Sequence, residues 1–453
     1  MDRTKRLAEF AAETGYKDLP KEVVEQAKFL ILDTLGCAIG GYTLASEEVK
    51  WVLELVKNQG CTGGPSTVFC DGFKTTAAYA ALANGAMVHT VDFDDTHMGS
   101  VAHLGASLVA TIFALAEQRK AGGREMIEAL VVGFDVGARV GRCAMPSHYK
   151  YWHPTATFGG IACAVAAAKL LGADAGQMEL AIGHAADEAG GMRYCIEKGD
   201  FSKSLHPAFA AMKGVLLASI VKIGATGPRG FLEYPSGFCN AYSTSPNWNA
   251  LTDGLGTKYE IMADTIKCFP TIQCSHTPIQ ATLDIMKSNK LKASDIESLH
   301  VLETETVPGQ GCNYEPASPL AGRLSIPFCI GLAVTEGRVS LEQFTEDKIQ
   351  DPGIREVMKK ITIEADSEFS KTYPDTIIAH VDIKTRGGKT FSQSRFYPKG
   401  DPRNRMTPAE LQAKFHQLAS NTVDEKRMKQ IITAIGKLEK TTDISKLIGL
   451  LVV

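Results

Sequence analysis

A twenty-residue segment concentrates more acid–base side chains than any other part of this chain. Residues 84–103 read NGAMVHTVDFDDTHMGSVAH and contain three aspartates and three histidines. Inside a globular protein such groups are paired or used, because an unpartnered buried charge costs several kcal/mol. Asp92 and Thr96 are four positions apart, so they share a side whether the segment is helical or extended. The segment is therefore a candidate for proton-transfer chemistry.

Three further polar clusters interrupt the surrounding helical patterns. HPTATFGG carries His153, KSLHPAF carries Lys203 and His206, and IKCFPTIQCSHTP carries Lys267 and His276. Each also has a simpler interpretation, such as a threonine N-cap beside a surface histidine or a solvated lysine. Their coincidence is the stronger signal, because every cluster offers a cation or a proton carrier.

Composition excludes several classes of partner. The 453 residues are 44% hydrophobic and 22% charged, with a formal net charge of −3. This balance is typical of a globular protein and leaves no basic footprint for nucleic acid or anionic lipid. An anionic substrate would need a local cluster of cations, and two domains are expected from the length.

The cysteines and the N-terminal residues indicate the cellular compartment of the protein. Eleven cysteines are scattered without any Cys-x-x-Cys pair, which fits a reducing environment and argues against a zinc site. MDRTKRLAEFAAETGYKD has no uninterrupted apolar core of signal-peptide type, and its polar residues recur too often for a membrane span. We therefore expect a cytoplasmic protein that is not bound to membranes.

Hydrophobic periodicity predicts a helical first half and a mixed later part. Apolar residues at spacings of three and four predict helices over 20–41, 104–123, 124–142 and 159–176. Beyond Cys268, strands are predicted over 296–307 and on both sides of a hairpin turn at Gly387–Gly388. Helices are predicted over 277–289, 352–361, 407–420 and 424–440. The fold class is thus mainly α with a smaller α+β domain.

Five motifs in order along the chain resemble the MmgE/PrpD family. They are ANGAMVHTVDFDDTH with His103, WHPTATFGG, KSLHPAFAAMKG with GATGPRGFLE, KCFPTIQCSHTPI, and KGDPRNRMTPAELQAKF. The family contains 2-methylcitrate dehydratases, cis-aconitate decarboxylase and iminodisuccinate epimerase. The resemblance implies a helical domain from residues 1–268 and 396–453, an inserted α+β lid domain from 269–395, and a homodimer. It also implies a small di- or tricarboxylate substrate bound between the domains, with no metal and no cofactor.

The resemblance assigns pocket positions to residues that the clusters had already isolated. They are Asp92, Thr96, His103, His153, Lys203 and His276. Removing a proton beside a carboxylate creates charge that needs a placed base and cations. We therefore expect His103 as principal acid or base, with His153 or His276 opposing it, and Lys203 as electrophile.

The remaining side chains are expected to position these groups or the substrate. Asp92 would orient a histidine, while Thr96, Lys267, Arg323 and His206 would contact the substrate, Arg323 by a bidentate contact to a carboxylate. Asp94 and Asp95 are equally well explained as solvated loop carboxylates or as caps of the following helix.

Two positions depart from the family pattern. SIPFCIGLA has Phe328 where many members have tyrosine, which counts against cis-aconitate decarboxylase activity because a phenol contact is missing. Leu104–Gly105 follows His103 in place of the frequent Pro-Ser, so the pocket wall is expected to differ there.

The leading hypothesis is a cofactor-independent lyase, a dehydratase or decarboxylase acting through an α-proton. An epimerase with two opposed bases uses the same site. A metal-dependent hydrolase would use Asp92, Asp94, Asp95, His97 and His103 as ligands, although their spacing matches no recognised metal motif. A non-catalytic scaffold predicts that the histidines are dispersed.

Overall fold

The computed structural model describes residues 2–304 and 311–453, and these form two compact units. Unit 1 comprises residues up to Arg193, Ser204–Ile266 and Met406–Val453, so it contains both chain ends. Unit 2 comprises Tyr194–Lys203 and Lys267–Arg405. Unit 1 is helical apart from four short strands, and unit 2 is α+β, which confirms the predicted fold class.

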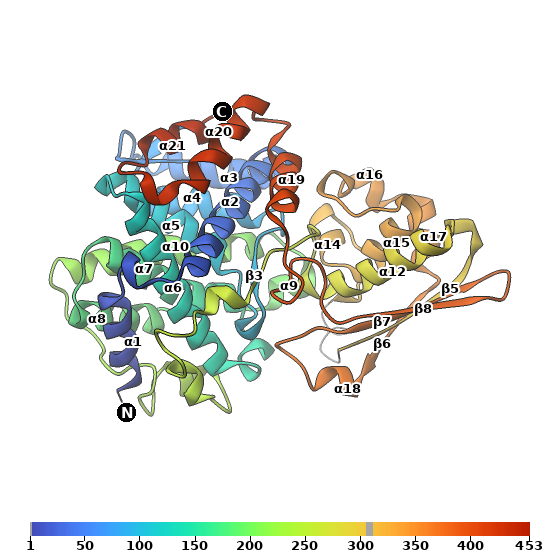
Figure 1. The fold of residues 1–453 in the computed structure, drawn as a ribbon, viewed down its shortest axis with the longest axis horizontal. Coiled ribbons are helices and arrows are strands. Elements are labelled where there is room, and N and C mark those ends of the chain that lie inside the picture. The colour runs from blue at the N-terminus through green and yellow to red at the C-terminus, as the bar shows by residue number, and fades with distance from the viewer. Residues whose placement is uncertain (1, 305–310) are drawn as a thin grey trace. The chain divides into compact units, whose positions relative to one another are not determined.

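Unit 1 is built from helices that share one apolar core. Its helices are α1 (Arg3–Glu13), α2 (Lys21–Leu44), α3 (Ser46–Asn58), α4 (Ala77–His89), α5 (Leu104–Arg119), α6 (Gly123–Ala144), α7 (Pro154–Leu170), α8 (Ala175–Asp187), α10 (Ser202–Lys222), α11 (Phe238–Tyr242), α19 (Pro408–Ala419), α20 (Glu425–Gly436) and α21 (Ser445–Leu451). Figure 1 shows the C-terminal helix α19, in red, beside α2, in blue. Residues far apart in sequence therefore meet in this core.

Glycine and alanine allow the central helices of unit 1 to approach closely. A Cβ atom on Gly137 of α6 would lie 2.6 Å from Ala162 Cβ of α7. α2 continues to Leu44, so the prediction that it ends at Gly40–Gly41 is wrong. Gly41 has a packing role, because a Cβ atom there would lie 1.9 Å from the Met87 carbonyl oxygen of α4.

Four short strands of unit 1 fix two loops. β1 (Ser66–Thr67) pairs with β2 (Lys74–Thr75), and β3 (Thr96–His97) pairs antiparallel with β4 (Asp264–Thr265). The second pair holds the end of the acid-rich segment in place, with Thr96 opposite Thr265 and His97 opposite Asp264.

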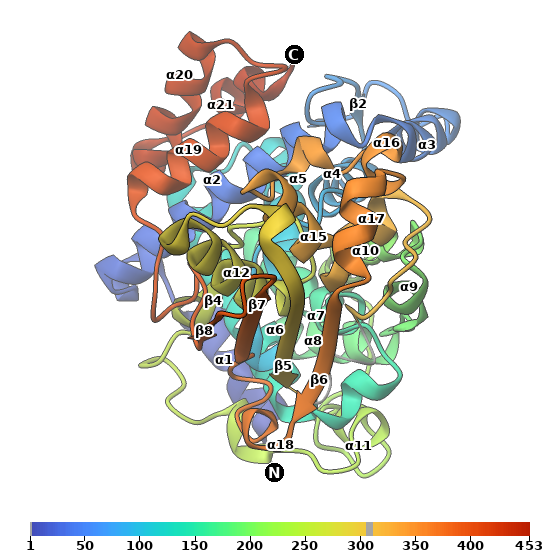
Figure 2. The ribbon, with the colours of Figure 1, turned by 90° about the vertical axis from the view of Figure 1, so that its right-hand side faces the viewer.

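Unit 2 contains a mixed four-stranded sheet in the order β6-β5-β7-β8, which Figure 2 shows side by side. The strands are β5 (Ile296–Thr304), β6 (Ile361–Asp366), β7 (Ala379–Thr385) and β8 (Thr390–Arg395). The helices of this unit are α9 (Tyr194–Lys198), α12 (His276–Asn289), α14 (Pro319–Arg323), α15 (Ile326–Glu336), α16 (Glu346–Ile349), α17 (Pro352–Met358) and α18 (Ser367–Ser370). The predicted hairpin at Gly387–Gly388 is confirmed, with Gly388 at φ +79°. The last three residues of the strand predicted over 296–307 lie outside the described residues.

The sheet of unit 2 is covered by helices on one face. Alternate residues of β7, from Ala379 to Thr385, are buried, and α12 packs on β7 and β8. The apolar core of this unit includes Ile279 of α12, Phe328 of α15 and Ile354 of α17.

One described helix, α10, is long and apolar enough to cross a membrane by length and composition. The bent pair α2–α3 meets the same test only if it is counted as one span. Half of the apolar window of α10 is buried inside the protein, as in the core helix of a globular unit. Phe209, Leu216 and Ile220 of this helix are exposed.

Candidate active site

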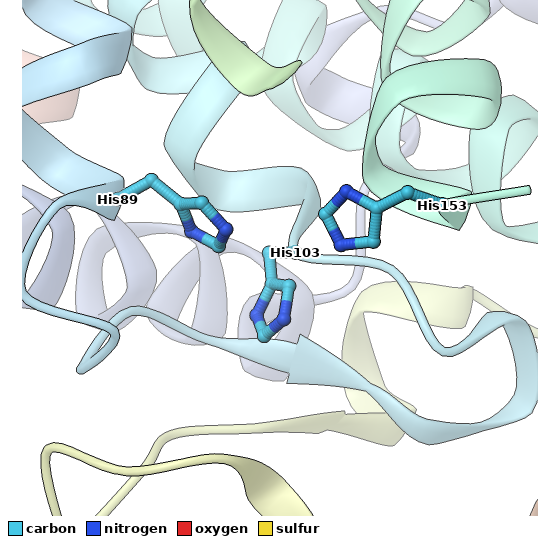
Figure 3. Close-up of side chains that lie close together, drawn as sticks. All are labelled: His89, His103 and His153. Atoms are coloured by element: carbon cyan, nitrogen blue, oxygen red, sulfur yellow. The ribbon is translucent and has the colours of Figure 1, made fainter. Parts of the chain in front are cut away.

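Three imidazole rings converge in unit 1. His89 ends α4, His103 precedes α5 and His153 precedes α7, and all three are buried. The ring centroids lie 4.7 Å apart for His89 and His103, 6.2 Å for His89 and His153, and 6.4 Å for His103 and His153. Figure 3 shows the rings of His89 and His153 turned toward each other, with the ring of His103 between and below them in this view. The scaffold hypothesis predicts dispersed histidines, and the pair of His103 and His153 does not fit it.

Asp94 holds the ring of His89. Its Oδ2 lies 2.8 Å from His89 Nδ1 and 3.9 Å from His103 Nδ1, and both partners of the shorter contact are fully buried. Asp92, for which we predicted a histidine-orienting role, lies in a turn with φ +49° and donates its backbone N–H to the His89 carbonyl. Its predicted role stays a prediction. The structure thus shows Asp94 in the orienting contact.

Backbone groups and hydroxyls fix His103. Its Nδ1 lies 2.6 Å from the Asp95 carbonyl oxygen and 3.2 Å from Thr96 Oγ1, and its backbone N–H donates to Thr155 Oγ1. Because a carbonyl oxygen can only accept, Nδ1 carries the proton and Nε2 is the basic nitrogen. The predicted substrate contact of Thr96 is untested, but its hydroxyl does contact the histidine.

His153 is paired with a fourth imidazole. Its Nδ1 lies 2.7 Å from Nδ1 of His206 on α10, and its backbone N–H donates to the Gly191 carbonyl. The simpler interpretation of a surface histidine beside a threonine cap is wrong. His153 itself is the N-cap residue of α7, and only 1% of its surface is exposed.

Asp95 caps the helix that follows it. Its Oδ2 accepts a hydrogen bond from Gly105 N in the first turn of α5, so the cap interpretation of this residue is confirmed. The packing is tight, because a Cβ atom on Gly105 would lie 2.3 Å from Asp95 Oδ1 and 2.7 Å from Leu30 Cδ1. The departure from the family's serine at this position therefore has a structural basis.

Replacing Gly105 with alanine is expected to destabilise the protein by about 1–3 kcal/mol, as overpacking of a core does. It should also lower turnover, because Asp95 must shift and its carbonyl holds His103. Urea denaturation and activity assays would measure both effects. Gly160→Ala on α7 is the matched control, since nothing lies within 4 Å of its Cβ position. Equal stability of the two variants would contradict the prediction.

A buried layer of carboxylates contacts the acid-rich segment. It consists of Asp33 on α2, Asp95 and Asp264, with the Lys414 ammonium of α19 at 2.6 Å from Asp33 Oδ1. Burial raises the pKa of Asp264 well above its ordinary value, and the charges of Asp95 and Asp33 raise it further. The protonated form of Asp264 is therefore favoured relative to an exposed aspartate. Burial lowers the pKa of Lys414, but the charge and hydrogen bond of Asp33, together with Cys37 and Asp94, raise it overall.

His97 belongs to a different contact network from the three clustered imidazoles. Its Nε2 lies 3.3 Å from Glu260 Oε2 and its Nδ1 lies 2.9 Å from Ser100 Oγ, while Arg142 donates to the other oxygen of Glu260. Among the described residues, the groups with ligand atoms within 4.8 Å of one another do not include the five ligands of the hydrolase hypothesis. That ligand set is not assembled.

Glu260 makes the stability of unit 1 depend on pH in the acidic range. Burial by itself raises the pKa of Glu260, but His97 and then Arg142 lower it to about 2 from an ordinary value of 4.5. Folding therefore gains from this carboxylate above about pH 4.5 and loses that gain as the pH falls toward about 2.

We expect the free energy of unfolding to fall by up to about 3 kcal/mol over this window, at about 1.4 kcal/mol for each pKa unit. Urea denaturation across the range should show a shallower decrease for Glu260→Gln. The exposed Glu356 supplies the control, and its Gln variant should follow the wild type. Parallel curves for wild type and Glu260→Gln would exclude this contribution.

The four predicted site residues of unit 2 are all buried. Lys203 lies at the start of α10, Lys267 precedes α12, His276 begins α12, and Arg323 ends α14. The simpler interpretation of Lys203 as a solvated lysine is therefore wrong. Burial raises the pKa of Cys195 to about 11, although the nearby positive charge of Lys203 lowers it in part.

Local contacts orient two of these residues. The His276 ring lies 5.4 Å from Phe269 in a T-shaped contact, with its Nδ1 3.6 Å from Cys268 Sγ. The backbone carbonyl of Arg323 accepts a hydrogen bond from the backbone N–H of Ile272. The Arg323 guanidinium lies 5.9 Å from the centroid of the Phe344 ring. Phe328 packs 6.0 Å from the same ring and is fully buried in the core of unit 2.

Sequence reasoning missed His89, Lys414 and Asp264 as members of the site. His89 lay inside the acid-rich segment, five residues before Asp94, and this spacing was the available signal. Lys414 and Asp264 come from distant segments with no local motif, so pairing across the fold was needed to find them.

Comparison with known protein families agrees with this geometry. The model of the MmgE/PrpD N-terminal domain matches residues 5–251, and that of the C-terminal domain matches residues 269–440. The chain belongs to the MmgE/PrpD family. The three-histidine cluster lies entirely within the part that matches the family's N-terminal domain.

Similar characterised proteins share this family and nearly the full length. A cis-aconitate decarboxylase of Aspergillus terreus is 28% identical over 473 residues, covering 99% of this chain and 95% of the relative. The cis-aconitate decarboxylase of Mus musculus is 26% identical over 440 residues, with 95% and 89% covered. That of Homo sapiens is 25% identical, with 96% and 91% covered.

Proposed function

We propose that this member of the MmgE/PrpD family is a lyase that acts on a small di- or tricarboxylate. The observation that carries the proposal is the buried cluster of His89, His103 and His153, whose rings are fixed by Asp94, the Asp95 carbonyl and His206. Full-length relatives that are cis-aconitate decarboxylases support the substrate class.

Such imidazoles suit both reactions that a lyase of this kind performs. In a decarboxylation, the bond between carbon and carboxylate breaks, carbon dioxide leaves, and the carbon that keeps the electron pair takes a proton from an imidazolium. In a dehydration, a neutral imidazole removes the proton beside a carboxylate, and the β-hydroxyl leaves as water after receiving a proton. Histidine can perform either transfer near neutral pH.

His103 is the proposed principal acid or base, because its Nδ1 proton is held by the Asp95 carbonyl and Nε2 is its basic nitrogen. His153 is the proposed second proton carrier, and His276 keeps its predicted opposing role as a hypothesis. Lys203, Lys267 and Arg323 are the proposed partners for substrate carboxylates, since cations are needed where anionic charge develops. These groups can supply the acid–base and electrostatic parts of the reaction without a cofactor.

Assays with cis-aconitate, citrate and 2-methylcitrate would test the proposal. Followed by NMR, they should show turnover of at least one acid to a decarboxylated or dehydrated product. In deuterium oxide, exchange into recovered substrate without loss of water or carbon dioxide would identify the epimerase alternative. No turnover and no exchange with any of these acids or with iminodisuccinate would contradict both.

We further propose that the chain forms a homodimer through α10. Phe209, Leu216 and Ile220 of α10 expose 39%, 51% and 46% of their surfaces, and their spacing places them on one helical face. Ile223, directly after the helix, exposes 85%. A second copy would cover this apolar face.

Light scattering after gel filtration should therefore give the mass of a dimer, and Leu216→Glu should shift it to that of a monomer. Tyr234→Glu, another exposed side chain outside this helix, should leave the mass unchanged. A monomeric wild type at micromolar concentration would contradict this proposal.

A further inference from the structure

The three-histidine cluster has the composition of a transition-metal site. One ring nitrogen from each of His89, His103 and His153 lies within 4.8 Å of the other two. Three nitrogens bound to one zinc ion at about 2.0–2.1 Å are about 3.3 Å apart in tetrahedral geometry. The ligand atoms therefore need to approach one another by at most about 1.5 Å to bind one ion.

The surroundings of each ring match those of metal-bound imidazoles. Histidine ligands of metals generally engage the second ring nitrogen with a carboxylate, a backbone carbonyl or another polar group. Here Asp94 Oδ2 holds Nδ1 of His89, the Asp95 carbonyl holds Nδ1 of His103, and His206 contacts Nδ1 of His153. In all three rings the nitrogen engaged by this contact is Nδ1.

Charge and burial also favour a divalent cation here. The Asp94 carboxylate is fully buried and within 3.9 Å of two of the rings, so it would balance part of the charge of the ion. Three neutral imidazoles with one open position are a donor set that zinc uses in proteins. The open position would be available to water or to a carboxylate.

We infer that His89, His103 and His153 bind a divalent transition-metal ion of the zinc type, and that this ion inhibits the proton-transfer chemistry. An imidazole nitrogen bonded to zinc has no lone pair left to accept a proton. The inhibition, but not the binding, rests on the proposed function.

Binding is tested directly with zinc. Protein treated with chelator, reloaded with Zn²⁺ and passed through gel filtration should retain one ion per chain by elemental analysis. His89→Gln and His153→Gln should lose it, and Asp94→Asn should lower the affinity about 10–100-fold. His300→Gln removes a histidine of β5 that pairs with Glu364, and it should bind like the wild type. Retention of zinc by both ligand variants would contradict the proposal that the three histidines bind it.

X-ray absorption on the wild type keeps the test decisive if a ligand variant fails to fold. Nitrogen ligands at about 2.0–2.1 Å support the histidine site, whereas sulfur at about 2.3 Å would assign the zinc to cysteines and overturn it. Once a substrate is known, Zn²⁺ should reduce turnover and chelator should restore it. Turnover that rises with zinc would refute inhibition while leaving the binding result intact.

Discussion

Replacing His103 with glutamine should lower kcat by about 10²–10⁴-fold, the contribution of a well-placed general acid or base. Glutamine keeps hydrogen-bonding capacity near the Asp95 carbonyl and Thr96 but cannot carry a proton between substrate and protein. Because His103 makes these contacts through Nδ1, the fold should survive the change. Turnover of the acid identified by the substrate assays would be compared with that of the wild type at saturating concentration.

His148 provides a matched control in the same unit. It is also buried, its Nε2 contacts Thr157 Oγ1, and burial lowers its pKa to about 3. This ring is therefore neutral at physiological pH and does not exchange protons there. His148→Gln should keep its turnover within about tenfold of the wild type. The loss of a general acid or base would lower turnover by at least about 100-fold. Equal losses in the two variants would remove the special role of His103.

Local patterns carried most of the fold prediction. Helices α5 and α6 begin within a residue of their predicted starts, because each start combines a change in hydrophobic period with a change in polarity. The hairpin between β7 and β8 followed from Gly387–Gly388. The end of α2 was misplaced because Gly41 looks like a terminator in sequence, whereas its role is to let α4 approach.

The residue types of the candidate site could be predicted from the sequence, but the contacts between its side chains could not. Histidine and aspartate in the 84–103 segment indicated proton transfer, and the structure brings His103 next to His153. The contact of Asp94 with His89 depends on the turn after α4, where Asp92 has a positive φ. No periodicity encodes such a turn, so this contact could not be predicted from the sequence.

Lys414→Met is the substitution expected to cost the most stability, about 3–5 kcal/mol, the typical effect of breaking a buried ion pair from one side. Methionine keeps much of the length and apolar volume but removes the ammonium that lies 2.6 Å from Asp33 Oδ1 and donates to the Phe93 carbonyl. Asp33 would be left as an uncompensated buried charge next to the segment that carries Asp94 and Asp95. Urea denaturation would measure the loss in free energy of unfolding.

Two further variants separate charge from packing in this prediction. Lys429→Met removes an exposed ammonium from an ion pair with Glu425 on α20, and it should change stability by less than about 1 kcal/mol. The double variant Lys414→Met with Asp33→Leu replaces both buried charges by apolar groups and should recover much of the loss, since such replacements are often neutral. A single variant as stable as the wild type would mean that Asp33 can take up a proton at little cost. A double variant no better than the single one would show that the contact of Lys414 with the Phe93 carbonyl, rather than its charge, ties α19 to the histidine cluster.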